Sequence, residues 1–269
     1  MKVVRTAAEL RAALDPERRV GASIGLVPTM GAFHAAHLSL IAAARAGSDR
    51  VVVSLFVNPA QFGRGEDLEH YPRDEARDLA VAEEEGVDLL FAPSADEIYP
   101  DGFDTWIDPG KVGSYLEGAA RPGHFRGVAT ICTRLFMLVQ PQRAYFGRKD
   151  AQQVAVVKQV VRDLQLPVEI VACPTVRDPD GLALSSRNVF LSPDERAVAL
   201  ALPRALQAGL AAHRSGEDAV RAARRVLDAQ PGLQVDYVAE ADLDGDTLAA
   251  AVLVGSTRLI DNVSLSTEG

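Results

Sequence analysis

Residues 20–37, VGASIGLVPTMGAFHAAH, decide the fold class of this 269-residue chain. The nearly continuous apolar run Val20–Val27 predicts a buried strand, and the turn at Gly31 leads into a helical segment, His37–Ala46. A second apolar run, Val51–Val57, follows that helix. Strands that are apolar on both faces are typical of a parallel sheet between two layers of helices. The stretch therefore predicts the first β–α–β unit of a doubly wound α/β fold.

The alternation of strands and helices continues through residue 175. Further strands and helices are predicted at Pro72–Glu85, Val87–Phe91, Gly127–Val139, Arg143–Phe146, Ala151–Leu164 and Val168–Ala172. Asp150 is expected to cap the helix that begins at Ala151, because its side chain can accept from free N–H groups of the first turn. Residues 1–175 are thus predicted to form a doubly wound parallel sheet with helices on both faces.

The pattern changes at the turn-rich connector Pro174–Gly181. Beyond it, alanine-rich helices and short strands are predicted at Pro193–Arg214, Glu217–Ala229, Val235–Glu240, Ala250–Leu253 and Arg258–Val263. We expect residues 176–269 to form a smaller C-terminal α+β domain that closes over the active site of the first domain.

The composition limits the partners and the compartment. The chain carries a formal net charge of −9, from 28 Lys and Arg against 37 Asp and Glu. It therefore lacks the broad basic surface that nucleic acid or an anionic membrane requires, and no apolar stretch is long enough to span a bilayer. No secretory hydrophobic segment follows Met1, and Cys132 and Cys173 lie outside metal-ligand spacings. We expect a cytoplasmic protein with no nucleic-acid or membrane partner.

One stretch, Glu66–Glu85, is strongly acidic, with nine acidic residues against Arg73 and Arg77. Its simplest interpretation is a solvated helix face. A magnesium-binding edge is the alternative, because carboxylates are the ligands that this cation prefers.

The strongest candidate site is the turn Pro28–His37 between the first strand and its helix. Gly31 lets the backbone turn at the end of the strand, and the next helix directs its N-terminal N–H groups toward whatever lies there. His34 and His37 are three residues apart, so they share one helix face. Two imidazoles at a helix N-terminus suit a triphosphate whose charge builds up as pyrophosphate leaves.

Three other motifs carry groups that bind phosphates, hydroxyls or carboxylates. Gly147–Asp150 follows a strand and opens a helix, with Lys149 as a point charge for phosphate. Ser185–Arg187 offers hydroxyls and a guanidinium to phosphate oxygens, in a loop that can close over a nucleotide. Asn58 and Gln61 offer neutral donors and acceptors for hydroxyls and a carboxylate. Three of the four motifs follow strands, and ligands of open α/β sheets bind outside the carboxyl ends of strands.

Several familiar sites are absent from the sequence. It has no GxxxxGK[ST] loop and no GxGxxG after the first strand, so neither a P-loop kinase nor a dinucleotide-dependent dehydrogenase fits. The GxSxG motif of α/β-hydrolases is missing too.

Taken together, the motifs resemble one known family. PTMGAFHAAHLSL (28–40), SLFVNPAQF (54–62), YFGRKDAQQ (145–153) and PTVRDPDGLALSSRN (174–188) look like segments of the pantothenate synthetases, or pantoate–β-alanine ligases. The resemblance implies a Rossmann-like fold of the nucleotidyltransferase type, with His34–His37 as the HxGH signature and Leu184–Arg187 as the KMSKS-like loop. It implies that the carboxylate of (R)-pantoate attacks the α-phosphate of ATP, giving pantoyl adenylate and pyrophosphate. The amine of β-alanine then displaces AMP to give pantothenate, with Mg²⁺ as the cofactor and a homodimer as the expected assembly.

The resemblance also implies roles for individual residues. The catalytic residues would be His37, His34, Lys149 and Arg187. The ATP-binding residues would be Thr29, Met30, Gly31, His34, His37, Gly147, Arg148, Lys149, Asp150, Val176, Leu184, Ser185, Ser186 and Arg187. Pantoate and β-alanine would be bound by Asn58, Gln61 and Gln153. Asp78 is what remains of an acidic pair associated with magnesium, because Arg77 stands at the other position.

The chain departs from the family pattern at two further positions. Ala36 stands where HxGH has glycine, and we expect its methyl group to weaken ATP binding modestly. Leu184 replaces a methionine of similar volume. Three rival functions stay open: a nucleotidyltransferase that leaves AMP on its product, an RNA-binding synthetase-like protein, and a catalytically silent nucleotide-binding protein. The net charge argues against the second rival, and the retained histidines argue against the third.

Overall fold

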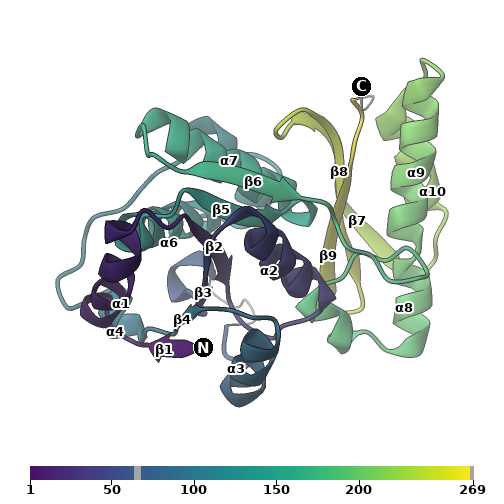
Figure 1. Cartoon of the computed structure of the whole chain (residues 1–269). Coiled ribbons are helices and arrows are strands. Elements are labelled where there is room, and N and C mark those ends of the chain that lie inside the picture. The colour runs from purple at the N-terminus through teal and green to yellow at the C-terminus, as the bar shows by residue number, and fades with distance from the viewer. Residues whose placement is uncertain (64–67, 267–269) are drawn as a thin grey trace. The chain divides into compact units, whose positions relative to one another are not determined.

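The computed structural model describes residues 1–63 and 68–266 and contains a six-stranded parallel sheet and a separate three-stranded antiparallel sheet (Figure 1). The chain divides into two compact units. The first unit comprises Met1–Gly147 and Gln152–Cys173, and the second comprises Arg148–Ala151 and Pro174–Gly269. The prediction of a doubly wound α/β fold with a smaller α+β part is confirmed.

The first unit holds the parallel sheet, whose strand order is β1-β4-β3-β2-β5-β6. Its strands are β1 (Lys2–Val4), β2 (Ile24–Thr29), β3 (Arg50–Leu55), β4 (Leu89–Phe91), β5 (Arg143–Gly147) and β6 (Glu169–Cys173). Its helices are α1 (Ala7–Arg19), α2 (Ala35–Gly47), α3 (Glu75–Glu84), α4 (Ala95–Ile98), α5 (Glu117–Ala120), α6 (His124–Val139) and α7 (Ala151–Asp163), with 3-10 turns η1 (Pro59–Gln61) and η2 (Gly110–Gly113). The order reverses between the neighbouring strands β2 and β5, which makes their carboxyl ends the topological switch point.

Alternate side chains of the central strands enter two different cores. Ile24 and Leu26 of β2 pack in a cluster with residues of α1, α6 and α7, whereas Val27 packs in a second cluster with residues of α2 and α3. In β3, Val52 enters the first cluster, and Val51 and Val53 enter the second. The period of two explains why these strands read as continuous apolar runs, since both faces of the sheet are covered.

Among the element boundaries that differ from the predictions, two have a clear local cause. The expected strand Val20–Val27 begins only at Ile24, because α1 extends to Arg19 and Val20, which is 79% exposed, ends that helix. The helix expected from Pro72 begins at Glu75, where Asp74 is the N-cap and accepts a hydrogen bond from Arg77 N at 3.0 Å.

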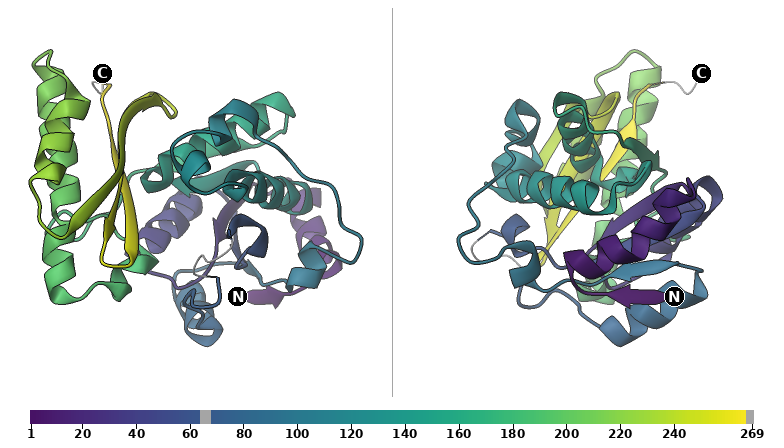
Figure 2. Two further views of the ribbon diagram at one scale, coloured as in Figure 1. Left: turned by 180° about the vertical axis from the view of Figure 1, so that it is seen from behind. Right: turned by 60° about the vertical axis from the view of Figure 1, so that its left-hand side comes forward.

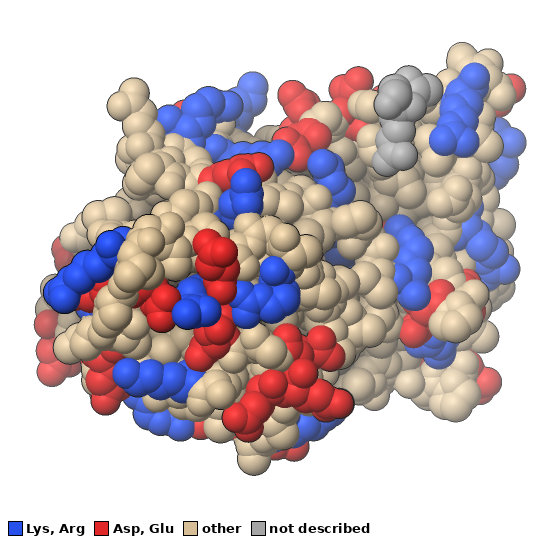
Figure 3. Space-filling view, viewed as in Figure 1, with Lys and Arg blue, Asp and Glu red and all other residues tan. Residues whose placement is uncertain are grey.

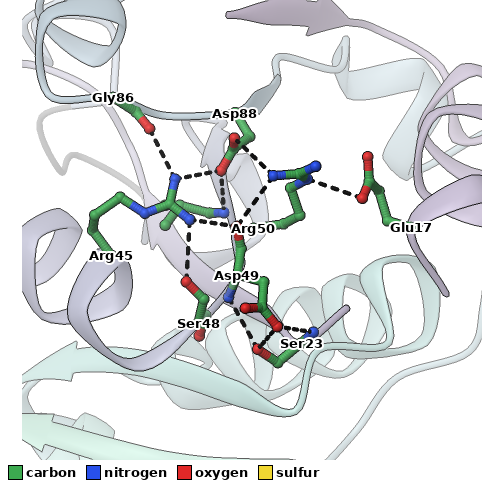
Figure 4. Close-up of polar contacts among 9 residues, drawn as sticks. Glu17, Ser23, Arg45, Ser48, Asp49, Arg50, Gly86 and Asp88 are labelled. Carbon is green, nitrogen blue, oxygen red and sulfur yellow. Dashed lines mark hydrogen bonds and ion pairs between the residues drawn. The ribbon is translucent and has the colours of Figure 1, made fainter. Parts of the chain in front are cut away.

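The amino ends of the strands carry a polar network that satisfies their exposed backbone groups (Figure 4). Asp88, just before β4, accepts from Val51 N at 2.7 Å and from the guanidinium of Arg45 at 2.6 Å. Asp49, just before β3, accepts from Ser23 N at 2.8 Å. The hydroxyl of Ser23, which donates to the same carboxylate at 2.7 Å, and the backbone N–H of Ser23 lower the pKa of the Asp49 carboxyl, because both hydrogen bonds favour its charged form. This edge of the sheet is therefore occupied by structural contacts, which leaves the carboxyl edge for ligands.

The second unit packs its antiparallel strands against two long helices (Figure 2). Its elements are η3 (Arg148–Asp150), η4 (Ser186–Phe190), α8 (Pro193–Ala199), α9 (Ala201–Arg214), α10 (Ala219–Asp228), β7 (Leu233–Asp242), β8 (Asp246–Val254) and β9 (Thr257–Ser264). Leu202 and Leu206 of α9, Leu227 of α10 and Leu248 of β8 are fully buried in its core.

The single helix predicted over Pro193–Arg214 is wrong: α8 ends at Ala199, and α9 begins at Ala201. Pro203 explains the break. A proline ring clashes with the carbonyl group four residues earlier, here that of Ala199, and the missing N–H cannot bond to it. Asp150, expected as the N-cap of α7, lies in η3, which runs directly into that helix.

Candidate active site

The carboxyl ends of β2, β3 and β5 carry the motifs that the sequence singled out in the first unit. Thr29 ends β2 and leads into the loop that holds His34, Asn58 follows β3, and Gly147 ends β5. Because β2 pairs with both β3 and β5, these segments leave the sheet side by side at its switch point.

The loop after β2 is held by the buried carboxylate of Asp78. Its Oδ2 accepts from Ala32 N at 2.8 Å, and its Oδ1 accepts from Phe33 N at 2.8 Å. The loop turns through a left-handed conformation, with φ +89° at Gly31 and φ +54° at Ala32. A Cβ atom on Gly31 would lie 2.8 Å from Asp78 Oδ2, so glycine is needed for the approach as well as for the turn. Asp78 is 2% exposed and thus acts as a rigid clamp on this backbone.

The two histidines lie together at the start of α2, as their spacing predicted. The ring centroids of His34 and His37 are 4.2 Å apart, and His34 is the residue that precedes the first helical turn. The backbone N–H of His34 points at Nδ1 of His37, with an N–N distance of 3.4 Å. An Nδ1 that accepts leaves the proton of the neutral imidazole on Nε2. His37 can therefore donate a hydrogen bond from Nε2 at a helix N-terminus that already favours negative charge.

A buried hydrogen-bonded chain connects the loop after β3 to the loop after β2. The hydroxyl of Tyr99 donates to Asn58 Oδ1 at 2.7 Å, Asn58 Nδ2 donates to Gln61 Oε1 at 3.0 Å, and Gln61 Nε2 lies 2.9 Å from the sulfur of Met30. Asn58 is 2% exposed, and its Nδ2 also donates to Gly127 O at 3.2 Å. Both polar atoms of its side-chain amide are thus engaged by the protein, so that Asn58 fixes the orientation of the Gln61 amide.

Tyr99 gives this chain a measurable pH dependence. Burial raises the pKa of its hydroxyl from 10.0 to about 12, so Tyr99 stays protonated and keeps donating to Asn58 far above neutral pH. Because the folded-state pKa is raised, the stability that the neutral Tyr99 contributes is fully present below pH 10 and is lost as the pH rises through about 12.

Tyr99→Phe is therefore expected to remove part of the alkaline loss of stability. The test compares the urea-derived free energy of unfolding of both proteins on either side of that pH range. Cys132, whose pKa burial also raises to about 12, is present in both and cancels in the comparison. Equal alkaline losses in the two proteins would contradict the role of Tyr99.

Some residues around Gln61 were not found from the sequence. His124 Nδ1 lies 2.8 Å from the carbonyl oxygen of Gln61, and Arg121 donates to the same oxygen at 3.4 Å. At Gly127 a Cβ atom would lie 2.3 Å from Ala60 O, so glycine allows α6 to approach the loop this closely. None of these residues belongs to a motif. The sequence indicated only that they lie just before or within the helix predicted at Gly127–Val139. Gln153 lies half-buried in the first turns of α7.

In the second unit, the phosphate-binding candidates lie on two short turns. Lys149 is in η3, with its side chain 19% exposed and its Nζ atom 3.8 Å from Asp150 Oδ1. Ser185 precedes η4, and its hydroxyl oxygen accepts from Arg187 N at 3.2 Å, which leaves its O–H free to act as a donor. Leu184 N donates to Val176 O at 3.0 Å and closes the turn-rich connector into a hairpin.

The described residues contain no cluster of three or more His, Cys, Asp or Glu side chains that could hold a metal ion. Asp78 accepts backbone hydrogen bonds with both oxygens. The acidic side chains of the stretch around α3, among them the exposed Asp74, Glu75, Glu83 and Glu84, form a solvated surface (Figure 3), as the simpler interpretation predicted. Glu66 and Asp67 lie outside the described residues. No described helix has both the length and the apolar character needed to cross a membrane.

Comparison with known proteins identifies the family. The profile of the pantoate–β-alanine ligases matches residues 2–264. The chain belongs to the pantoate–β-alanine ligase family. It is 54% identical to the pantothenate synthetase of Roseiflexus sp. (strain RS-1), over 98% of this chain and 99% of that one. The crystal structure of pantothenate synthetase from Thermus thermophilus matches with a TM-score of 0.92 at 49% identity, covering 98% of this chain and 99% of that one.

A pantoate–β-alanine ligase from Francisella tularensis, crystallised with β,γ-ATP and β-alanine, matches with a TM-score of 0.86 at 34% identity, covering 99% of this chain and 98% of that one. Membership in the pantoate–β-alanine ligase family confirms the predicted fold type and the predicted activity. The chain is an ATP-dependent ligase that condenses pantoate with β-alanine to form pantothenate.

Proposed function

We propose that this ligase works in two steps at the carboxyl edge of the parallel sheet. A carboxylate oxygen of (R)-pantoate attacks the α-phosphorus of ATP, and the bond to the bridging oxygen breaks to release pyrophosphate. The amine of β-alanine then attacks the acyl carbon of pantoyl adenylate, loses a proton and displaces AMP. The observation that carries this proposal is the pair of adjacent histidines at the N-terminus of α2, whose ring centroids lie 4.2 Å apart at the switch point of the sheet.

The nucleotide is assigned to residues of both units. His37 and His34 would donate to phosphate oxygens as charge builds up on the leaving pyrophosphate. Lys149, Ser185, Ser186 and Arg187 would hold the same phosphates. The hydroxyl of Thr29 donates to Ser54 O at 2.7 Å, so Thr29 would hold the start of the loop after β2 against β3. The remaining ATP contacts are proposed at Met30, Gly31, Gly147, Arg148, Asp150, Val176 and Leu184.

The acceptor acid is assigned to the amides of Gln61 and Gln153. Gln61 is 8% exposed and its side chain is oriented by Asn58, so it can present a fixed polar group to the hydroxyls or the carboxylate of pantoate. Asn58 would support this contact from behind. The Francisella ligase binds β-alanine, and we propose that Gln61 also borders the β-alanine site here.

Mg²⁺ is proposed to arrive with ATP, as part of the substrate. The described residues offer no protein cage for it, and Asp78 is occupied by the loop. The ion neutralises phosphate charge when bound. The triphosphate would be oriented by the two histidines, Lys149 and Arg187.

Ala36→Gly is expected to lower the KM for ATP by about fivefold, which corresponds to relief of about 1 kcal/mol of overpacking. Ala36 lies in the first turn of α2, between the two histidines. The same change should destabilise the helix by about 1 kcal/mol, because glycine is a poor helix former. Steady-state kinetics and thermal unfolding measure the two effects, and an unchanged KM for ATP would show that the methyl group is harmless.

A homodimer and a cytoplasmic location are further proposals, supported by the family resemblance and the composition of the chain. Sedimentation equilibrium tests the first: a monomer at micromolar concentration would contradict it.

The test of the reaction follows pyrophosphate and AMP. Purified protein receives MgATP and (R)-pantoate, with and without β-alanine. Pyrophosphate on addition of pantoate, with multiple turnovers to AMP only when β-alanine is present, is the expected result. Pyrophosphate without AMP under any condition would indicate nucleotidyl transfer instead. No pantoate-dependent pyrophosphate would contradict the proposal and direct attention to Ala36.

A further inference from the structure

Two adjacent residues of β9, Asp261 and Asn262, each hold a different segment of the second unit. Asn262 Nδ2 donates to the backbone carbonyl of Arg148 at 2.9 Å and to that of Lys149 at 2.8 Å. A side-chain amide nitrogen carries two hydrogens, and here both have a carbonyl acceptor. The turn η3 is thus tied to β9, although it lies between β5 and α7 in the sequence.

Asp261 holds the hairpin that leads to the serine loop. Its carboxylate is 1% exposed and accepts from both terminal nitrogens of Arg177, at 2.6 Å and 3.0 Å. Arg177 also donates to Gly181 O at 3.1 Å, across the hairpin. A buried bidentate pair has one geometry, and loss of either partner leaves an uncompensated charge.

The hairpin also fixes the backbone that leads into Ser185. Arg177 pairs with Ala183 as an antiparallel bridge, and Leu184 N donates to Val176 O at 3.0 Å. Ser185 follows immediately and caps η4 through Arg187 N. The loop Ser185–Arg187 therefore follows a hairpin that Asp261 holds, and the next residue of β9, Asn262, holds the backbone of Lys149.

We propose that Asn262, together with Asp261, is a positioning residue for ATP. Asn262 fixes the backbone of Lys149 at a set distance from the loop Ser185–Arg187. Lys149 and the loop can then bind the same triphosphate. Lysine has a long, flexible side chain, and its ammonium group reaches a defined place only when its backbone is fixed. The inference rests on the proposed contact of Lys149 with phosphate. It adds a residue to those required for ATP binding that no sequence motif contains, since β9 lies outside all the motifs found in the sequence.

Asn262→Ala tests the inference in the full-length protein. The value of kcat/KM for ATP is expected to fall by about 10- to 100-fold, because small displacements of a phosphate-binding group cost rate steeply. The KM values for pantoate and β-alanine should stay unchanged. Asn262→Ser, which keeps one donor, should recover part of the loss, and Asn262→Asp, which offers no donor to the carbonyls, should lose more than alanine does.

The decisive readout is a double-mutant cycle with Lys149→Ala. If Asn262 acts through Lys149, the second substitution adds little once the first is made. Asp236→Asn is the matched control, because it removes the charge of an exposed ion pair, 2.7 Å long, that joins Asp236 to Arg258 of β9, the strand that also carries Asn262. Its kinetics should be those of the wild type.

Three outcomes would overturn the inference: full additivity in the cycle, an equal loss of affinity for all three substrates, or the same kinetic defect in Asp236→Asn. If Asn262→Ala does not fold, the cycle is run with Asn262→Ser and gives the same decision. Failure of the proposed function looks different, since the wild-type protein would then release no pyrophosphate with pantoate.

Discussion

His37→Ala is expected to slow pantoate-dependent pyrophosphate release by about 100- to 1,000-fold, the usual effect of removing one hydrogen-bond donor to a developing charge. The donor in question is Nε2, because Nδ1 faces the backbone N–H of His34 at 3.4 Å. The effect should fall on kcat for adenylate formation more than on the KM for ATP, because the negative charge on the phosphates grows in the transition state.

Rapid-quench measurement of pyrophosphate in a single turnover, without β-alanine, isolates this step. His37→Gln can offer an amide N–H at similar reach and should recover part of the rate, whereas the shorter His37→Asn should not. Ser39→Ala, in the same helix turn, is the control, because the Ser39 hydroxyl donates to Ala36 O at 2.8 Å within the helix itself. An alanine variant with the wild-type single-turnover rate would show that His37 has a structural role.

The sequence was sufficient for the parallel sheet because its central strands are covered on both faces, as their apolar runs indicate. It was less informative at one edge. The edge strand β1 has only three residues and was not predicted, and the helix α1 was overlooked although Thr6 and Glu9 form a capping box that the sequence displays. Pro203 could have revealed the break between α8 and α9, since a proline in the first turn excludes a continuous helix before it.

In the site, the motifs next to strand ends were predictable because the carboxyl ends of parallel strands meet at one edge. The supporting residues were not. Tyr99 lies 41 residues from Asn58, and Asn262 lies 113 residues from Lys149, so only the tertiary structure brings these groups together. Asn58 itself resembled a ligand, because the sequence alone does not show whether an amide side chain is exposed or buried.

Asp78→Asn is expected to lower kcat/KM for ATP by about 100-fold, because the loop that carries His34 would lose its fixed geometry. The asparagine has the same shape, but it offers one oxygen to two N–H donors and turns an amide N–H toward one of them. One buried N–H would stay without an acceptor, at a cost in stability of about 1–3 kcal/mol. The positive φ angle of Ala32 adds to the effect, because a residue with a Cβ atom holds this left-handed conformation only while the clamp is in place.

The measurement is a set of ATP titrations at rising Mg²⁺ concentration, with thermal unfolding of the same samples. If Asp78 is a clamp, added Mg²⁺ will not restore the activity of Asp78→Asn; if it were a metal ligand, high Mg²⁺ would. Asp49→Asn is the matched control, because Asp49 also accepts a backbone N–H, that of Ser23 at 2.8 Å, but at the amino edge of the sheet. That variant should be less stable and keep its KM for ATP, which separates loss of loop geometry from general loss of stability.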